Sequence, residues 1–108
     1  MIFIIHSKLL YEEALKYEKA IGEKCYIPLR DTPQENPDVV LQENYNGMKK
    51  CSEVRVLWNG ESFGSMFDMG MAYALGIPIK PILCKGEERW RQYFKFMIRK
   101  KIIRGKDE

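Results

Sequence analysis

The sequence predicts a single α/β domain whose strands form a parallel sheet. Two observations lead to this prediction. The chain has 108 residues, which is the size of one domain, and short apolar runs alternate along it with longer stretches of helical periodicity. Strands that alternate with helices in this way pair in parallel, with right-handed crossovers that place helices on both faces of the sheet. We therefore expect one domain over residues 1–108.

The first half of the chain contains two predicted strands and two predicted helices. Residues 2–5 form a run of β-branched and aromatic side chains, which is typical of a strand buried on both faces. Apolar residues recur at helical spacing over 9–21, and Gly22 follows as a natural stop. A second strand is predicted over 24–29, and a proline-containing loop separates it from a second helix over 38–50.

The second half repeats this alternation. A third strand over 54–58 ends at the Asn-Gly turn of residues 59–60. A third helix over 65–75 begins at its capping serine, and a fourth strand over 78–84 and a last helix over 87–99 follow. The order βαβαβαβα predicts a flavodoxin- or Rossmann-like three-layer sandwich with a parallel sheet of four or five strands.

Composition excludes several classes of protein. Hydrophobic residues make up 45% and charged residues 31% of the chain, as in globular rather than disordered proteins. No apolar run is long enough for a membrane helix, and the N-terminus does not resemble a signal peptide, so we expect a cytoplasmic protein with no membrane partner. Cys25, Cys51 and Cys84 are isolated and there is one histidine, so we expect plain thiols and no metal site.

Basic residues gather near the C-terminus. Residues 85–106 contain 9 basic and 2 acidic side chains, whereas residues 1–84 contain 9 basic and 11 acidic ones. Such a patch can attract phosphate on a nucleotide, on nucleic acid or at a membrane, but a solvated basic face is commoner. Nucleic acid remains an alternative partner, although it is not the one that we expect.

The topology predicts where a ligand binds. In open parallel sheets, ligands lie beyond the carboxyl ends of the strands, where the strand order reverses. If the first and third strands flank that point, the loops that begin at His6-Ser7 and at Asn59-Gly60 converge there. Glycines in the second loop let the backbone approach a ligand, and the helix N-terminus that follows favours an anion.

Residues 62–76, Ser-Phe-Gly-Ser-Met-Phe-Asp-Met-Gly-Met-Ala-Tyr-Ala-Leu-Gly, resemble a motif of the nucleoside 2-deoxyribosyltransferase family and of its relatives, the nucleoside 5′-monophosphate N-glycosidases. Further likeness at Ser7, at residues 26–30 and at residues 44–50 extends over nearly the whole chain. The positions that match the spacing of the motif are Ser62, Gly64, Asp68, Gly70, Ala72, Gly76 and Pro78.

The resemblance implies a catalytic role for Asp68, which takes the place of the family's glutamate and is one methylene shorter. Cleavage of an N-glycosidic bond passes through an oxocarbenium-like state, which a carboxylate beneath the anomeric carbon can stabilise or attack. We expect Asp68 in the first turn of its helix, where the helix dipole keeps the carboxylate ionised. The alternative is an aspartate that only supports the helix.

The resemblance also implies further contacts with the ligand. Ser7 and Ser62 would donate hydroxyl hydrogen bonds to a 5′-phosphate or 5′-hydroxyl, with Gly60 and Gly64 beside them, although Ser62 can also be a helix cap. Asn44 falls near the place of the family's aspartate that assists departure of the base. An amide can hydrogen-bond a base but cannot serve as a carboxyl acid.

Five other residues are candidates with structural alternatives. Trp58 can stack on a base or pack in the core. Tyr11 stands near the place of a family aromatic that covers the nucleobase or sugar. His6 can line the pocket or be a structural histidine, and Arg30 can meet a phosphate or pair near Asp31. Glu53 is interpreted as a surface or packing residue, because it begins its strand at the wrong end of the sheet.

Family members build their sites across a subunit interface, so the resemblance implies a homodimer or higher homo-oligomer with shared sites. Lys95 falls near a phosphate-binding serine that the neighbouring subunit contributes in the N-glycosidases. The alternative is that Lys95, with Arg91 and Arg99, forms the solvated side of a helix.

The sequence therefore predicts an enzyme that cleaves or transfers the N-glycosidic bond of a nucleoside or nucleotide, with no metal or organic cofactor. The alternative is a protein of the same fold that binds or sequesters a nucleotide without efficient catalysis. The base, the sugar and the acceptor remain open.

Overall fold

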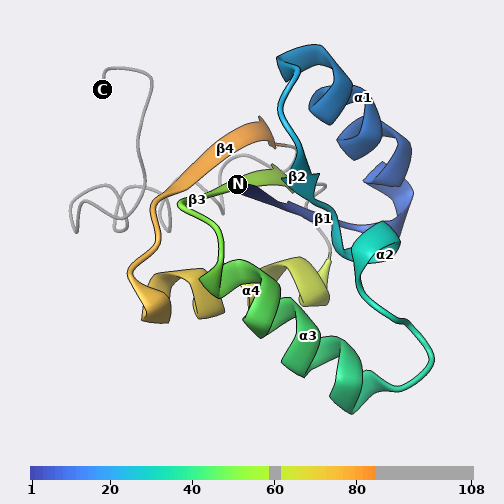
Figure 1. The fold of residues 1–108 in the computed structure, drawn as a ribbon, viewed down its shortest axis with the longest axis vertical. Coiled ribbons are helices and arrows are strands. Elements are labelled where there is room, and N and C mark those ends of the chain that lie inside the picture. The colour runs from blue at the N-terminus through green and yellow to red at the C-terminus, as the bar shows by residue number, and fades with distance from the viewer. Residues whose placement is uncertain (59–61, 85–108) are drawn as a thin grey trace.

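The computed structural model describes residues 1–58 and 62–84, which form an α/β fold around a four-stranded sheet (Figure 1). The strands are β1 (Ile2–His6), β2 (Cys25–Tyr26), β3 (Glu53–Trp58) and β4 (Ile79–Cys84). They lie in the order β2-β1-β3-β4, and every neighbouring pair is parallel. The predicted fold class and the parallel sheet of four strands are confirmed.

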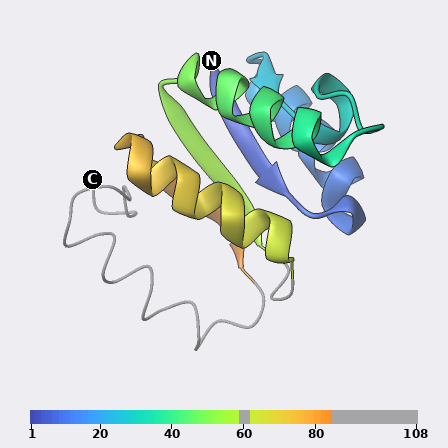
Figure 2. The same ribbon diagram turned by 90° about the horizontal axis from the view of Figure 1, so that it is seen from below.

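Helices cover both faces of this sheet, which gives the three layers (Figures 1 and 2). One face carries α1 (Tyr11–Ile21), which follows the short 3-10 helix η1 (Lys8–Leu10). The other face carries α3 (Pro37–Lys49) and α4 (Phe63–Leu75), which contact each other. Gly22 ends α1 in the left-handed conformation, with φ of 66°, as expected for a glycine stop.

The core lies on both sides of β1. Phe3 and Ile5 are buried in the cluster that faces α3 and α4, whereas Ile2 and Ile4 are buried in the cluster that faces α1. Successive side chains of a strand point to opposite faces, so a central strand between two helical layers is apolar at every position. The run of apolar residues at the N-terminus is explained by this double burial.

The second strand is shorter than predicted. The sequence predicts a strand over 24–29, but β2 contains only Cys25 and Tyr26, and the helix α2 (Pro28–Asp31) follows at once. Pro28 occupies the first position of α2, where its missing N–H costs nothing and its fixed φ favours a helix. The side chain of Asp31 also accepts a hydrogen bond from Ile27 N–H at 2.8 Å, which stabilises the start of α2.

Three other expectations from the sequence concern membrane helices, the cysteines and the last helix. Within residues 1–58 and 62–84, no helix has the length and apolar character needed to cross a membrane. Cys25 and Cys51 are buried free thiols, and burial raises the pKa of Cys25 to about 11. The predicted last helix over 87–99 lies outside the described residues.

Candidate functional site

A pocket of about 360 Å³ lies at the carboxyl ends of the strands, where the strand order reverses between β1 and β3. β1 pairs with β2 on one side and with β3 on the other, so the segments that follow β1 and β3 diverge here. The structure brings five of the predicted site residues together in the lining of this pocket: Ser7, Asn44, Ser62, Gly64 and Asp68.

The N-terminus of α4 forms one wall of the pocket, and it begins earlier than predicted. Ser62, not Ser65, is the N-cap: its backbone is extended, and its Oγ accepts a hydrogen bond from Ser65 N–H at 3.1 Å. The structure thus shows the capping alternative for Ser62, and the residue also lines the pocket. Ser65 is buried at 2% exposure, and its Oγ has no hydrogen-bond partner among the described residues.

Because α4 starts at Phe63, Asp68 lies in the second turn of the helix and no acidic residue occupies the first. The expectation that the helix dipole keeps Asp68 ionised is therefore wrong, since that effect fades beyond the first turn. Burial instead raises the pKa of Asp68 to about 7. At neutral pH the carboxyl group is present in both its neutral and its ionised form, so it can act as an acid, a base or a nucleophile.

Asn44 is held in the opposite wall by a buried hydrogen-bonded chain. Its Oδ1 accepts from Thr32 Oγ1 at 2.7 Å, and Thr32 Oγ1 is in turn hydrogen-bonded to the hydroxyl of Tyr26. Asn44 and Thr32 are 6% and 3% exposed, so the amide cannot exchange these partners for water. The sequence did not reveal Thr32 or Tyr26, because a contact between β2, the α2–α3 loop and α3 has no characteristic spacing.

His6 also lines the pocket, at the end of β1. Its Nδ1 lies 2.8 Å from the carbonyl oxygen of Ser7. A carbonyl only accepts, so Nδ1 carries the proton. Burial lowers the pKa of His6, although the hydrogen bond to Ser7 opposes this effect. The imidazole is therefore neutral at pH 7, and Nε2 is a buried acceptor with no partner in the described part of the chain.

Two aromatic candidates lie elsewhere. Trp58 is 2% exposed and belongs to the core cluster between the sheet and α3 and α4, so the structure shows core packing rather than stacking on a base. Tyr11 packs against the cluster on the α1 side, with its ring 5.9 Å from that of His6, and is not part of the pocket lining. Asn59, Gly60 and Lys95 lie outside the described residues.

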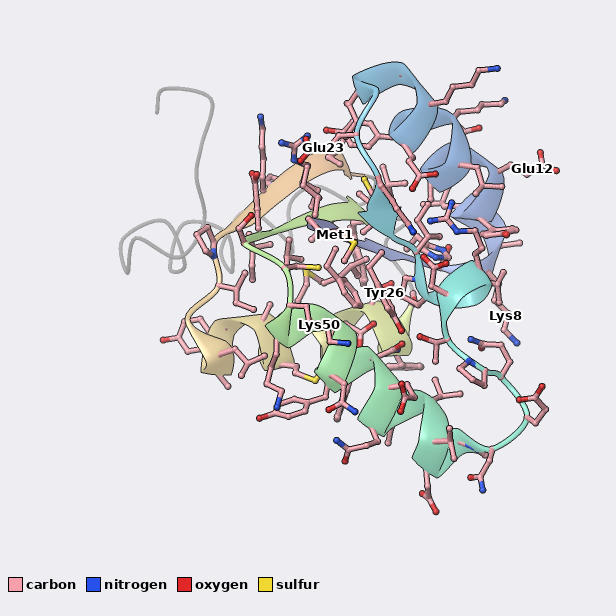
Figure 3. All side chains as sticks on the ribbon, in the orientation of Figure 1. Met1, Lys8, Glu12, Glu23, Tyr26 and Lys50 are labelled. Atoms are coloured by element: carbon pink, nitrogen blue, oxygen red, sulfur yellow. The ribbon has the colours of Figure 1, made fainter. Side chains whose placement is uncertain are left out.

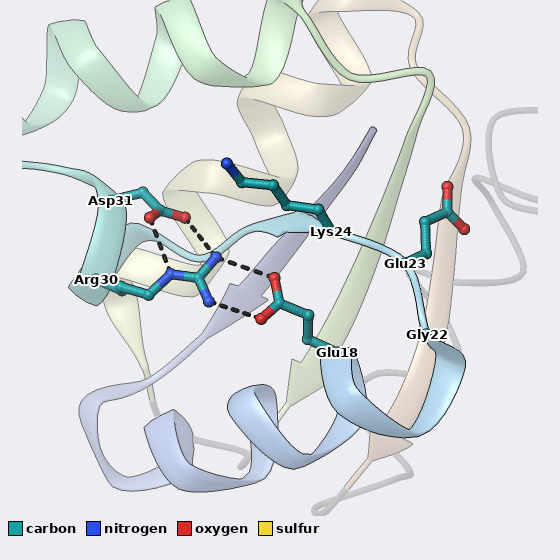
Figure 4. Close-up of a pocket in the computed structure, with 6 residues that line it drawn as sticks. All are labelled: Glu18, Gly22, Glu23, Lys24, Arg30 and Asp31. Carbon is teal, nitrogen blue, oxygen red and sulfur yellow. Dashed lines mark hydrogen bonds and ion pairs between the residues drawn. The ribbon is translucent and has the colours of Figure 1, made fainter.

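The ionic candidates Arg30 and Glu53 are engaged in ion pairs. Arg30 bridges Glu18 and Asp31, with its Nη1 2.6 Å from Glu18 Oε1 and its Nε 2.9 Å from Asp31 Oδ1 (Figure 4). The hydrogen bond from Arg30 and a second one from a backbone N–H lower the pKa of Glu18 to about 2. Glu53 pairs with Arg55 at 3.2 Å, at the end of β3 away from the pocket. Arg30 therefore pairs near Asp31, which is the structural alternative for this residue, and Glu53 is a packing residue, as interpreted from the sequence.

Comparison of the chain with protein-family models, with curated proteins and with solved structures found no match. The resemblance to the nucleoside 2-deoxyribosyltransferase family therefore stands on the sequence motif of residues 62–76 and the further likeness at Ser7, 26–30 and 44–50. What the structure adds is the geometry of the pocket: a neutral histidine, a restrained amide, a helix N-terminus and a carboxyl group with a raised pKa around one cavity.

Proposed function

We propose that the pocket binds a nucleoside or nucleotide and that the protein cleaves or transfers its N-glycosidic bond. One observation supports this above the others: five residues that the resemblance selects, from the segment after β1, from α3 and from the start of α4, line the same pocket, and they are Ser7, Asn44, Ser62, Gly64 and Asp68. Its volume of about 360 Å³ is within the range of small-molecule sites. The proposed chemistry requires neither a metal ion nor an organic cofactor.

The N-terminus of α4 would hold the polar end of the ligand. Unpaired N–H groups in the first turn of a helix and the helix dipole favour a negative charge. Ser7 and Ser62 border this region, and Lys8 adds a positive charge to the lining. Among the described residues, a Cβ added at Gly64 would approach only Ser62 Oγ, at 4.0 Å, which leaves room for a ligand beside the backbone there.

Asp68 would act on the anomeric carbon. In its ionised form the carboxylate would stabilise the oxocarbenium-like transition state, or it would attack the anomeric carbon and form a glycosyl ester while the N-glycosidic bond breaks and the base leaves with the electron pair. Water or an acceptor base would then attack the same carbon and release Asp68. Asn44 would hydrogen-bond the departing base without giving it a proton. Since burial raises the pKa of Asp68 to about 7, the ionised fraction and the rate should rise with pH around neutrality.

A binding protein without turnover is the second candidate, and it is favoured by Asn44. This amide occupies the position where an acid would assist departure of the base, and its hydrogen bond to Thr32 holds it there. The same pocket would then sequester or sense a nucleotide. A homo-oligomer with sites completed by Lys95 of a neighbouring copy is a further part of the proposal that rests on the resemblance.

The test is to incubate the full chain with ribo- and deoxyribonucleosides and their monophosphates, with and without an acceptor base, and to follow free or exchanged base by chromatography. We expect base release that increases with pH from 6 to 8 and is lost in Asp68→Asn. The control is Asp38→Asn, which changes an exposed aspartate at the start of α3. Saturable binding without base release would favour the second candidate, and the absence of both would overturn the proposal.

A further inference from the structure

Two buried polar atoms belong to residues that line the pocket and have no hydrogen-bond partner among the described residues: His6 Nε2 and Ser65 Oγ. His6 ends β1, and Ser65 lies in the first turn of α4, which contacts β1. Ser65 is 2% exposed. Neither residue is among the positions that match the spacing of the motif. An unpaired buried polar group destabilises the folded state, so two of them around one cavity suit a bound ligand.

The imidazole of His6 is held so that Nε2 accepts a hydrogen bond. Its Nδ1 donates to the carbonyl oxygen of Ser7 at 2.8 Å, and its ring lies 5.9 Å from that of Tyr11, which restricts its rotation. In the neutral imidazole the lone pair is then on Nε2. Ionised phosphate and carboxylate oxygens also only accept, so this atom suits a hydroxyl or an N–H group of a ligand rather than an anion.

The order of residues along α4 indicates which part of a nucleotide lies at Ser65. Ser62, Ser65 and Asp68 are three residues apart, so they follow one another along one side of the helix, with a rise of roughly 4.5 Å between neighbours. In the proposed function Ser62 lies at the 5′ end of the ligand and Asp68 at the anomeric carbon. The sugar ring joins these two parts, so the hydroxyl of Ser65 lies beside the sugar.

We infer that His6 and Ser65 bind the 2′- and 3′-hydroxyls of the sugar, one each, and that the pocket selects a ribonucleoside or its monophosphate over the 2′-deoxy counterpart. This inference rests on the proposed function. A ribose offers two hydroxyls to the two buried groups, whereas a 2′-deoxyribose offers one and leaves one buried group unpaired. A site built to bind a hydroxyl strongly rejects an analogue that lacks it, because its own polar group then has no partner.

Isothermal titration calorimetry of the full chain tests the selection. Asp68→Asn, in which we expect no base release, is titrated beside the wild type so that binding is measured without cleavage. The probes are the ribonucleoside 5′-monophosphates of the common bases with their 2′-deoxy and 3′-deoxy counterparts, so that each comparison removes one hydroxyl. We expect at least one ribonucleotide to bind about tenfold or more tightly than either deoxy counterpart.

Two further changes in the Asp68→Asn background assign the contacts. Ser65→Ala should reduce the penalty for the loss of one of the two hydroxyls to about threefold or less, and His6→Phe should do the same for the other. A purely structural role would weaken the binding of all three sugars alike. His6→Gln, which keeps an acceptor near Nε2, should retain part of the preference.

The matched control is Ser52→Ala, at an exposed serine before β3 and at the other end of the sheet, which should leave all affinities unchanged. Circular dichroism establishes that each variant is folded. Ser65→Ala should fold as well as its parent, because it removes a buried hydroxyl that has no partner in the described part of the chain.

Equal binding of ribo- and 2′-deoxynucleotides, as expected if one hydroxyl serves both groups, would overturn the inference and leave the proposed function in place. So would tighter binding of the deoxynucleotides, or a preference that His6→Phe and Ser65→Ala both leave unchanged. If no nucleotide bound to the wild type or to Asp68→Asn, the proposed function would fail, and this inference would fail with it.

Discussion

The carboxyl group of Asp68 makes the folded protein less stable when it is ionised. Burial raises its pKa from 3.8 to about 7 in the folded chain. Below about pH 4 the group is protonated in both the folded and the unfolded chain, and it has no effect on stability. As the pH rises from 4 to 7, the unfolded chain releases the proton before the folded chain does, so the free energy of unfolding falls.

Replacement of Asp68 by asparagine should remove this cost. We expect Asp68→Asn to increase the free energy of unfolding by about 2–4 kcal/mol at pH 8 and to change it little at pH 4. Urea denaturation at the two pH values measures the difference. Asp38→Asn is the control, because Asp38 is exposed. A gain in stability that is equal at both pH values would contradict the assigned cause. Such a cost is typical of a residue kept for function.

At the residue scale, the sequence predicted the part of the pocket that a local motif encodes. Ser62, Gly64 and Asp68 follow one another along a helix, and their spacing is visible in the chain. The contact of Thr32 with Asn44 joins residues from the α2–α3 loop and α3, and burial decides it. Burial also decides the pKa of Asp68, and no local pattern reports how deeply a side chain will lie.

At the scale of elements, α3 and β2 are joined by a contact that depends on Gly47. The ring of Tyr26 stacks on Phe3, with ring centroids 5.1 Å apart, and packs against α3 where Gly47 has no side chain. Tyr26 lies between the sheet and α3, whereas Lys8 and Glu12 point away from the sheet (Figure 3). Gly47 therefore lets α3 approach β2 closely enough for the Tyr26 hydroxyl to reach Thr32 beside the pocket.

Alanine at this glycine should destabilise the protein. A Cβ at Gly47 would lie 2.5–2.9 Å from three carbons of the Tyr26 ring, so Gly47→Ala should cost about 1–3 kcal/mol in spite of the higher helix propensity of alanine. Gly70→Ala is the matched control in α4, where the new Cβ meets no atom of the described residues within 4 Å; it should gain up to about 1 kcal/mol. Thermal or urea unfolding measures both. Equal effects of the two changes would show that the contact with Tyr26 does not matter.

Two carboxyl groups in the described part of the chain, Asp68 and Glu18, respond to pH in opposite ways. Asp68 lines the pocket, whereas Glu18 of α1 pairs with Arg30 of α2, which also pairs with its neighbour Asp31 (Figure 4). The hydrogen bond from Arg30 lowers the pKa of Glu18 from 4.5 to about 2. The stability that this pair contributes is complete above about pH 4.5 and is lost as the pH falls towards 2, whereas the cost of ionised Asp68 grows above pH 4.

The free energy of unfolding of Glu18→Gln should therefore depend less on pH, between about pH 4.5 and 2, than that of the wild type. We expect the variant to be less stable than the wild type at pH 7 and the difference to shrink as the pH falls from 4.5 to 2. Denaturation midpoints along a pH series measure this. The control is Glu13→Gln, whose partner Lys16 lies 3.8 Å away on the surface of α1. A constant difference between wild type and Glu18→Gln across the series would count against the role of the ion pair.

The sheet type and the alternation of the four strands with α1, α3 and α4 were predictable, because short apolar runs mark buried strands and a period of 3.6 residues marks helices. The short helix α2 was not predicted. The end of β2 could not be predicted, because Pro28 is compatible with a turn, with an edge strand or with the first turn of a helix, and packing decides among them. The α4 start was also misplaced, since Ser62 and Ser65 are both good capping residues and only the fold selects Ser62.

The strand order also determines when the chain can fold during synthesis. β1 leaves the ribosome before the other three strands of the sheet, but its longer ladder is with β3, where Ile2 pairs with Glu53 and His6 with Leu57. Its pairing with β2 involves only two residues of each strand. Until β3 emerges, the apolar side chains of β1 lack most of their final neighbours, and a nascent chain that stops before β3 would expose an unpaired, aggregation-prone strand edge.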